Sequence, residues 1–313
     1  MGERKKYRDI YKVHVIDFNC QTDALVAFPG IKENYEYRGF HHSTREDWVN
    51  KISTLMRKGL VFYCYGDDEI IEKDEKHKFE DLERLSTIAY QSRTPKRPEN
   101  KDGLLGEVLL DLIIQIYYED CTKLTTRMLF RQDDNFEVKG YDAAYFIKKD
   151  GCVSIWLGQS KFGGKNYCRG EIHKDLIKSF DTLYLSDYLY FISDKRVFPS
   201  AEARELLEII DDLNFNATET TGETRRDSLL QTMKDRNISL TVPCLLAYGS
   251  KSVYKNDSNL AKAIGEEVKE FHNFYKDTRY GIEGIECHIM FFIFPIKDLG
   301  LIRGKGGFYD GLR

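Results

Sequence analysis

The spacing of apolar residues predicts several amphipathic helices. Within Gly103–Asp120, apolar residues at 105, 108, 109, 112, 113 and 116 recur three or four positions apart, which is the period of one helix face. The same reasoning predicts further helices over Asp47–Lys58, Phe79–Tyr90, Gly170–Tyr190, Ala201–Asp212 and Leu260–Tyr275.

Alternating or short continuous apolar runs predict strands between these helices. Four of them cover Lys12–Asp17, Leu60–Tyr65, Leu240–Tyr248 and Glu286–Pro295. Two more, Tyr141–Lys148 and Val153–Phe162, flank an Asp150-Gly151 dipeptide that is typical of a two-residue hairpin turn. The segment 214–225 is rich in Thr, Asn and Gly and is predicted to be a loop.

A polar segment at residues 92–102 interrupts this pattern and holds two of the six prolines. It predicts a linker. We therefore expect a small α/β N-terminal domain over residues 1–95, with partner contact as its expected role, and a larger domain over 96–313. The mixture of strands and helices predicts an α/β (α+β) fold, with a mixed sheet flanked by helices.

Composition narrows the class of protein. The 313 residues carry a net charge of −4, so any contact with nucleic acid needs a local basic patch or a partner. The seven cysteines form no CxxC pair, which predicts free thiols in a reducing cytoplasm. No apolar run is long enough for a membrane span, and the basic N-terminus lacks the apolar stretch of a signal peptide. We expect a cytoplasmic protein without membrane contact.

Candidate chemistry gathers between residues 103 and 161. Glu107 lies on the long predicted helix, Asp142 opens the first hairpin strand, and Gln159-Ser160-Lys161 lies on the return strand. Gln159 and Lys161 point to one face of that strand, roughly 7 Å apart. Asp142 comes from the paired strand, so it can lie beside them, and a helix packed on the sheet can bring Glu107 to the same point.

This set suits phosphodiester hydrolysis. That reaction needs a water deprotonated near neutral pH and charge stabilisation on phosphate oxygens, and a divalent cation held by oxygen ligands supplies both. The expected ligands of Mg²⁺, with Mn²⁺ as the alternative, are Glu107, Asp142, Gln159 and the carbonyl of Ser160. Lys161 would orient the attacking water and offset developing negative charge.

These residues resemble a known family. The order Glu, Asp and Gln-x-Lys resembles the PD-(D/E)XK restriction-endonuclease-like pattern. More narrowly, Gly103–Glu107, Gly140–Ala144 and Gly158–Phe162 look like the C-terminal domain of the HamA family, and Phe291–Leu299 fits it too. The resemblance covers residues 96–313.

The resemblance implies a nuclease subunit of the bacterial Hachiman anti-phage system. It also implies a partner, the superfamily-2 helicase-like protein HamB, which senses DNA and controls its degradation by the nuclease. Gln159 departs from the usual acidic residue of the pattern, and it removes one negative charge from the expected metal site. Mrr-type restriction nucleases also use Gln-x-Lys. The alternative is a catalytically decayed adaptor subunit that docks on the helicase.

Basic residues follow the motif directly. Lys165, Arg169 and Lys174 are candidate nucleic-acid contacts, with an ordinary solvated helix face as the alternative. The stretch 158–165 does not have phosphate-loop spacing, and Asn166 stands where that motif needs Ser or Thr. His41-His42 lacks a third ligand at metal spacing and is predicted to be a polar turn.

Overall fold

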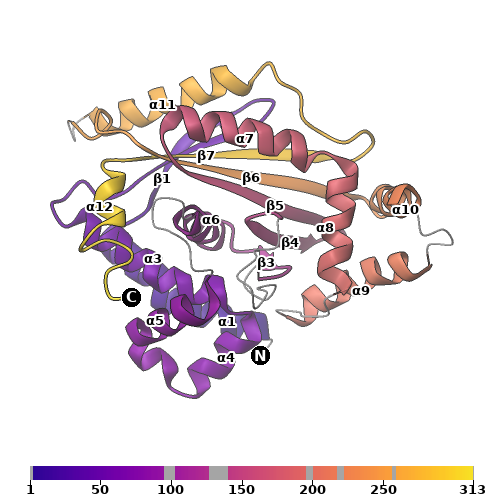
Figure 1. The fold of residues 1–313 in the computed structure, drawn as a ribbon, viewed down its shortest axis with the longest axis horizontal. Coiled ribbons are helices and arrows are strands. Elements are labelled where there is room, and N and C mark those ends of the chain that lie inside the picture. The colour runs from indigo at the N-terminus through magenta and orange to yellow at the C-terminus, as the bar shows by residue number, and fades with distance from the viewer. Residues whose placement is uncertain are drawn as a thin grey trace.

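A computed structural model describes residues 3–94, 103–126, 140–194, 200–216, 222–255 and 259–312. A seven-stranded sheet forms its centre, in the order β1-β2-β7-β6-β5-β4-β3 (Figure 1). The strands are β1 (Val26–Lys32), β2 (Glu36–His41), β3 (Thr122–Lys123), β4 (Ala143–Lys149), β5 (Cys152–Gly163), β6 (Ile238–Gly249) and β7 (Cys287–Ile296).

Parallel and antiparallel pairs are mixed in this sheet. β5, β6 and β7 run parallel, and β2 runs parallel to β7. β4 and β5 form the predicted antiparallel hairpin. Its turn residues Asp150 and Gly151 have φ of 52° and 79°, the left-handed conformation that a two-residue hairpin turn requires. The Asp-Gly signal is therefore confirmed.

Helices cover both faces of the sheet. α7 (Lys165–Ser179) and α11 (Leu260–Tyr275) lie on one face, and α6 (Leu104–Tyr117) lies on the other (Figure 1). Outside α6 pack α1 (Glu3–Tyr11), α3 (Trp48–Cys64), α4 (Asp67–Glu75) and α5 (Leu82–Arg93). The remaining helices are α2 (Asp17–Thr22), α8 (Thr182–Asp194), α9 (Ala201–Asn216), α10 (Gly222–Asp235) and α12 (Leu299–Arg303). This architecture confirms the predicted mixed α/β class.

Two strand predictions in the N-terminal part are wrong. Lys12–Ile16 forms a π-helical turn that runs into α2, and Leu60–Cys64 is the last part of α3. α3 is buried on nearly all sides in this part, because it packs against both α5 and α6. A short apolar run in a buried helix has the same pattern as a buried strand, so periodicity could not separate them.

Two further predictions need correction. The helix predicted over Gly170–Tyr190 is two helices, because α7 ends at Ser179 and the Asp181 carboxylate accepts the Tyr184 N–H, 2.9 Å away, at the start of α8. The loop predicted over 214–225 is helical at both described ends, since α9 continues to Asn216 and α10 starts at Gly222. Residues 217–221 of that loop lie outside the described residues.

The predicted division at residues 95 and 96 also lies outside the described residues. The sheet nevertheless joins the two predicted domains, because β2 comes before residue 95, β7 comes after it, and the two strands pair. One apolar core is shared as well, and it includes residues of α3, α6 and β7. None of the described helices is long and apolar enough to cross a membrane.

Candidate active site

β5 extends beyond its hairpin partner, and this leaves an open edge in the sheet. β4 pairs with β5 only as far as Gly158, whereas β6 continues to pair with β5 through Gly163. Among the described residues, 159–163 therefore have a neighbouring strand on one side only. The candidate residues Gln159, Ser160 and Lys161 all lie in this extension.

Asp142 lies at the end of β4 and turns its carboxylate into the open edge. Its Oδ2 accepts the Ser160 N–H at 2.7 Å and the Ser160 hydroxyl at 2.9 Å. Its own N–H donates to the Gly158 carbonyl, 2.8 Å away, which continues the hairpin by one step. Since the N–H and C=O of one strand residue point to the same edge, the Ser160 carbonyl faces the Asp142 side as well.

The side chains of the β5 extension alternate between the two faces. Odd-numbered residues of β5 pack in the core beneath α7, and even-numbered ones pack in the core beneath α6. Gln159 and Lys161 thus share the α7 face, as the alternation predicts, and Ser160 faces α6. Gln159 and Ser160 are both buried.

Lys161 pairs with a carboxylate that the sequence analysis did not single out. Its Nζ lies 2.5 Å from Oδ2 of Asp175 on α7, and both side chains are mostly buried. Burial alone would lower the pKa of Lys161. The carboxylates of Asp142 and Asp175 more than offset this, so the pKa is raised and Lys161 stays positively charged.

Glu107 approaches the open edge from the other face of the sheet. It lies in the first turn of α6 and is buried, with Oε2 2.5 Å from the Tyr63 hydroxyl of α3. The residue before it, Gly106, packs so closely on β5 that an added Cβ would lie 3.1 Å from the Ser160 hydroxyl oxygen. Because that hydroxyl also donates to Asp142, the first turn of α6 lies against the end of β5 that holds Asp142.

A buried polar cluster continues along α6 one turn after Glu107. Asp111 lies 3.5 Å from the Lys123 ammonium and accepts a short hydrogen bond from the Tyr145 hydroxyl. Burial raises the pKa of Asp111, and the Lys123 charge opposes that rise. Tyr63, Asp111, Lys123 and Asp142 line one small polar cavity between the two clusters. Sequence reasoning missed this cluster, because its members come from elements that have no common motif.

The residues at the open edge include the oxygen ligands expected for a small divalent cation. No group of three or more His, Cys, Asp and Glu side chains with a metal-binding arrangement occurs in the described part of the chain. The expected ligand set here is different, because it combines the Asp142 carboxylate, the Gln159 amide and the Ser160 carbonyl. All three are hard oxygen ligands, which Mg²⁺ and Mn²⁺ prefer. Glu107 is the fourth expected ligand, and its carboxylate accepts the Tyr63 hydroxyl.

The three candidate nucleic-acid contacts each have a carboxylate partner. Lys165 lies 2.6 Å from both Glu267 and Glu270 of α11, and Arg169 lies 3.7 Å from Glu270. Lys174 pairs with Glu171 at 2.7 Å on the exposed side of α7. The Lys174–Glu171 pair is solvent-exposed, and such pairs are weak, so a phosphate could exchange with that carboxylate at little cost. The Lys165 and Arg169 side chains are only 25% and 28% exposed, so their pairs are partly buried.

His42 has a structural role. It is fully buried between the rings of Trp48 and Tyr254, with ring centroids 4.1 and 4.2 Å away. Its Nδ1 lies 2.7 Å from the Ser43 carbonyl, and its Nε2 accepts the Lys297 N–H at 3.0 Å. Both ring nitrogens are therefore engaged within the protein.

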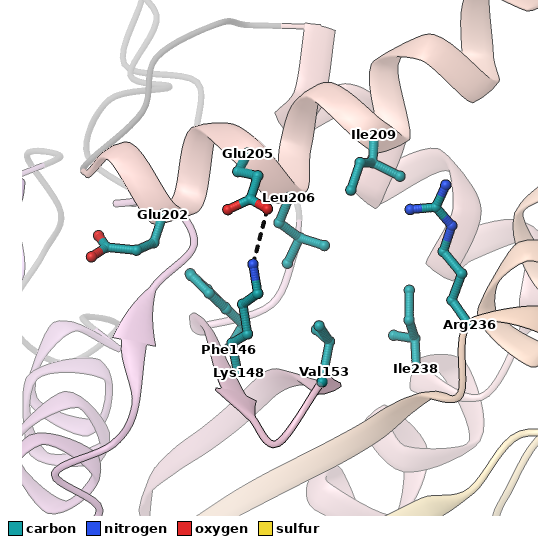
Figure 2. Close-up of a pocket in the computed structure, with 10 residues that line it drawn as sticks. Phe146, Lys148, Val153, Glu202, Glu205, Leu206, Ile209, Arg236 and Ile238 are labelled. Carbon is teal, nitrogen blue, oxygen red and sulfur yellow. Dashed lines mark hydrogen bonds and ion pairs between the residues drawn. The ribbon is translucent and has the colours of Figure 1, made fainter.

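A cavity of about 380 Å³ lies at the other end of the β4–β5 hairpin, under α9 (Figure 2). Its floor is apolar, with Phe146, Val153 and Ile238. Lys148 and Glu205 form an ion pair of 2.9 Å across it. None of the candidate catalytic residues lines this cavity.

Comparison with known proteins gives a family for the whole chain. A search of curated proteins found no match. A family model described as HamA matches residues 14–310, which includes the N-terminal part that the motif resemblance did not cover. The chain therefore belongs to the HamA family, the family that its motifs resemble.

Proposed function

We propose that this protein is a metal-dependent DNA endonuclease that acts as a subunit of a Hachiman anti-phage defence complex. The observation that carries the proposal is the arrangement at the open end of β5. There Ser160 fixes the Asp142 carboxylate through two hydrogen bonds. The residues on either side of Ser160 are Gln159 and the charged Lys161. Membership of the HamA family supports the role in defence.

The residues of the site have distinct tasks in this proposal. Asp142, Gln159, the Ser160 carbonyl and Glu107 would hold a divalent cation. When bound, that cation would make a water more acidic and offset charge on the phosphate. Lys161 orients the attacking water and stabilises the negative charge that develops on the phosphate oxygens. Ser160 holds Asp142 in place through two hydrogen bonds to one carboxylate oxygen.

Control by a helicase partner belongs to the same proposal. The net charge of −4 gives the chain no general attraction for DNA. Its candidate phosphate contacts Lys165, Arg169 and Lys174 are already paired with carboxylates. A HamB-like helicase that binds DNA would therefore supply affinity, and the nuclease would act on the DNA that it presents.

The test is cleavage of plasmid DNA by the full chain, copurified with its helicase partner, with and without Mg²⁺. We expect Asp142→Ala and Lys161→Ala each to abolish Mg²⁺-dependent cleavage. Lys149→Ala, at the far end of the hairpin, is the matched control and should cut like the parent. Thermal unfolding should verify that each variant is folded. Cleavage at the parental rate by both site variants would refute the site assignment.

Gln159 favours a second candidate function, a catalytically decayed adaptor that docks on the helicase. Its neutral amide removes one negative charge from the expected cation site, so it weakens the attraction for a divalent cation. The substitution Gln159→Glu separates the two functions. If the parent does not cut DNA and the Gln159→Glu variant does, the parent is the adaptor. If the parent cuts, the nuclease proposal stands.

A further inference from the structure

We propose that Asp175 is a positioning residue, which holds the Lys161 ammonium at the open end of β5. This inference rests on the proposed nuclease function. Asp175 lies on α7, outside the Glu, Asp and Gln-x-Lys pattern, and its Oδ2 is 2.5 Å from Lys161 Nζ. It would act through Lys161 and would not bind the cation or the DNA.

The burial of this pair makes positioning effective. The Lys161 and Asp175 side chains are 19% and 25% exposed, so solvent and salt screen their attraction less than that of a surface pair. The Lys148–Glu205 pair in Figure 2, at 52% and 62% exposure, is a surface pair of the same chemistry. A free lysine side chain samples many rotamers, and the Asp175 contact restricts them before the reaction begins.

The contact leaves Lys161 with capacity for chemistry. An ammonium group has three N–H donors, and Asp175 contacts it through a single carboxylate oxygen. The contact therefore leaves donors for a water or a phosphate oxygen. Gln159 lies two residues before Lys161 on the same face of β5, and Ser160 between them holds the Asp142 carboxylate. A fixed ammonium therefore lies beside the residues expected to bind the cation.

The pair is not what attaches α7 to the sheet. Cys168, Ile172 and Leu176 on the sheet-facing side of α7 are completely buried and provide the packing. Loss of one carboxylate at Asp175 should therefore leave the helix in place. This makes a change in activity without a change in fold the expected consequence of substitution.

The first test compares Asp175→Asn, Asp175→Glu and the parent in plasmid cleavage by the copurified complex. We expect Asp175→Asn to lower kcat about tenfold or more with little change in KM, because the misplaced ammonium affects the reaction and not binding. Asp175→Glu should recover most of the loss. Glu205→Gln, which breaks the surface pair, should change neither constant. Parental or faster cleavage by Asp175→Asn would overturn the proposal.

The second test does not depend on activity. Lysines of the full chain are acylated with acetic anhydride and quantified by mass spectrometry. We expect Asp175→Asn to raise acylation of Lys161 several-fold, with Lys148 unchanged, and Glu205→Gln to raise only Lys148. Asp175→Glu should keep Lys161 protected. Equal Lys161 acylation in parent and Asp175→Asn would overturn the proposal.

Together the tests separate the two claims. If the parent does not cut DNA, the proposed function fails, and acylation still decides whether Asp175 holds Lys161. If the parent cuts and Asp175→Asn cuts equally well, the nuclease function stands and the positioning role is refuted.

Discussion

Tyr63 connects the N-terminal helices to the proposed catalytic residues. Its hydroxyl lies 2.5 Å from Glu107 Oε2, and both side chains are buried. Loss of a donor to a buried carboxylate costs about 1–3 kcal/mol, so the contact should matter both for stability and for the orientation of Glu107.

We therefore expect Tyr63→Phe to lower the free energy of unfolding by about 1–3 kcal/mol, measured by urea denaturation. It should also reduce Mg²⁺-dependent cleavage, because Glu107 loses a fixed orientation. Tyr11→Phe is the matched control. Its buried hydroxyl has no hydrogen-bond partner among the described residues, so its loss should cost nothing. Equal effects of the two variants would contradict the role of Tyr63.

The sequence could indicate Asp142, Gln159 and Lys161 because strand alternation and a hairpin turn fix their relative positions. Tyr63 and Asp175 could not be found in this way. Tyr63 reaches Glu107 from another helix, 44 residues earlier in the chain. Asp175 lies on the helix after β5, outside the motif, and contacts Lys161 only because α7 packs on the sheet. Such contacts depend on how elements pack, which no local spacing encodes.

At the scale of elements, His42 joins the end of β2 to α3 and to the segment after β7. Burial lowers the pKa of His42 to about 3, and the hydrogen bond to the Ser43 carbonyl only partly opposes this. The unfolded chain has a histidine pKa of about 6.5. Below that pH the unfolded state binds a proton that the folded state excludes.

The stability that His42 contributes is therefore present above a pH of about 6.5 and is lost as the pH falls towards about 3. The full loss is of the order of 5 kcal/mol, which is comparable to the total stability of many domains. We expect the parent to lose about 2 kcal/mol between pH 6.5 and 5 from this group. His42→Phe keeps a ring between Trp48 and Tyr254, and it should be less stable at pH 7 but lose less on acidification. Parallel pH profiles in urea denaturation would contradict this account.

Element predictions succeeded for the amphipathic helix α11 and for the two long apolar runs that form β6 and β7. α11 has the predicted bounds, and β6 and β7 differ from theirs by one or two residues at each end. The sequence pattern did not predict β1, because Pro29 and Gly30 interrupt its apolar residues. At that point the pairing of β1 with β2 also shifts in register. Pro is tolerated there because β1 is an edge strand.

At the scale of the whole molecule, the C-terminal segment packs on helices from the N-terminal part of the chain. α12 contacts α3, and Arg57 of α3 donates to the Gly307 carbonyl at 2.8 Å. Thr87 of α5 donates to the Gly311 carbonyl at 2.9 Å. The C-terminal segment thus lies on helices that precede residue 95, and β2 covers the edge of β7.

This arrangement leads to a prediction for a chain that starts at residue 96. Without β2, the β7 edge would be unpaired along Met290–Ile293, and the buried rings of Phe292 and Phe294 would lose Phe40 and other N-terminal neighbours. An exposed apolar edge strand favours aggregation. We expect residues 96–313 alone to be insoluble or to unfold without a cooperative transition, and coexpression with residues 1–94 to restore a soluble complex.

The same experiment decides whether the N-terminal part is a separate domain. A soluble fragment 96–313 with a cooperative thermal transition would support two independent domains divided near residue 95. A fragment that folds only with residues 1–94 would show one structural unit. Tyr63 would then have to be present for Glu107 to be oriented, and a reconstituted complex should cut DNA more slowly when the N-terminal fragment carries Tyr63→Phe.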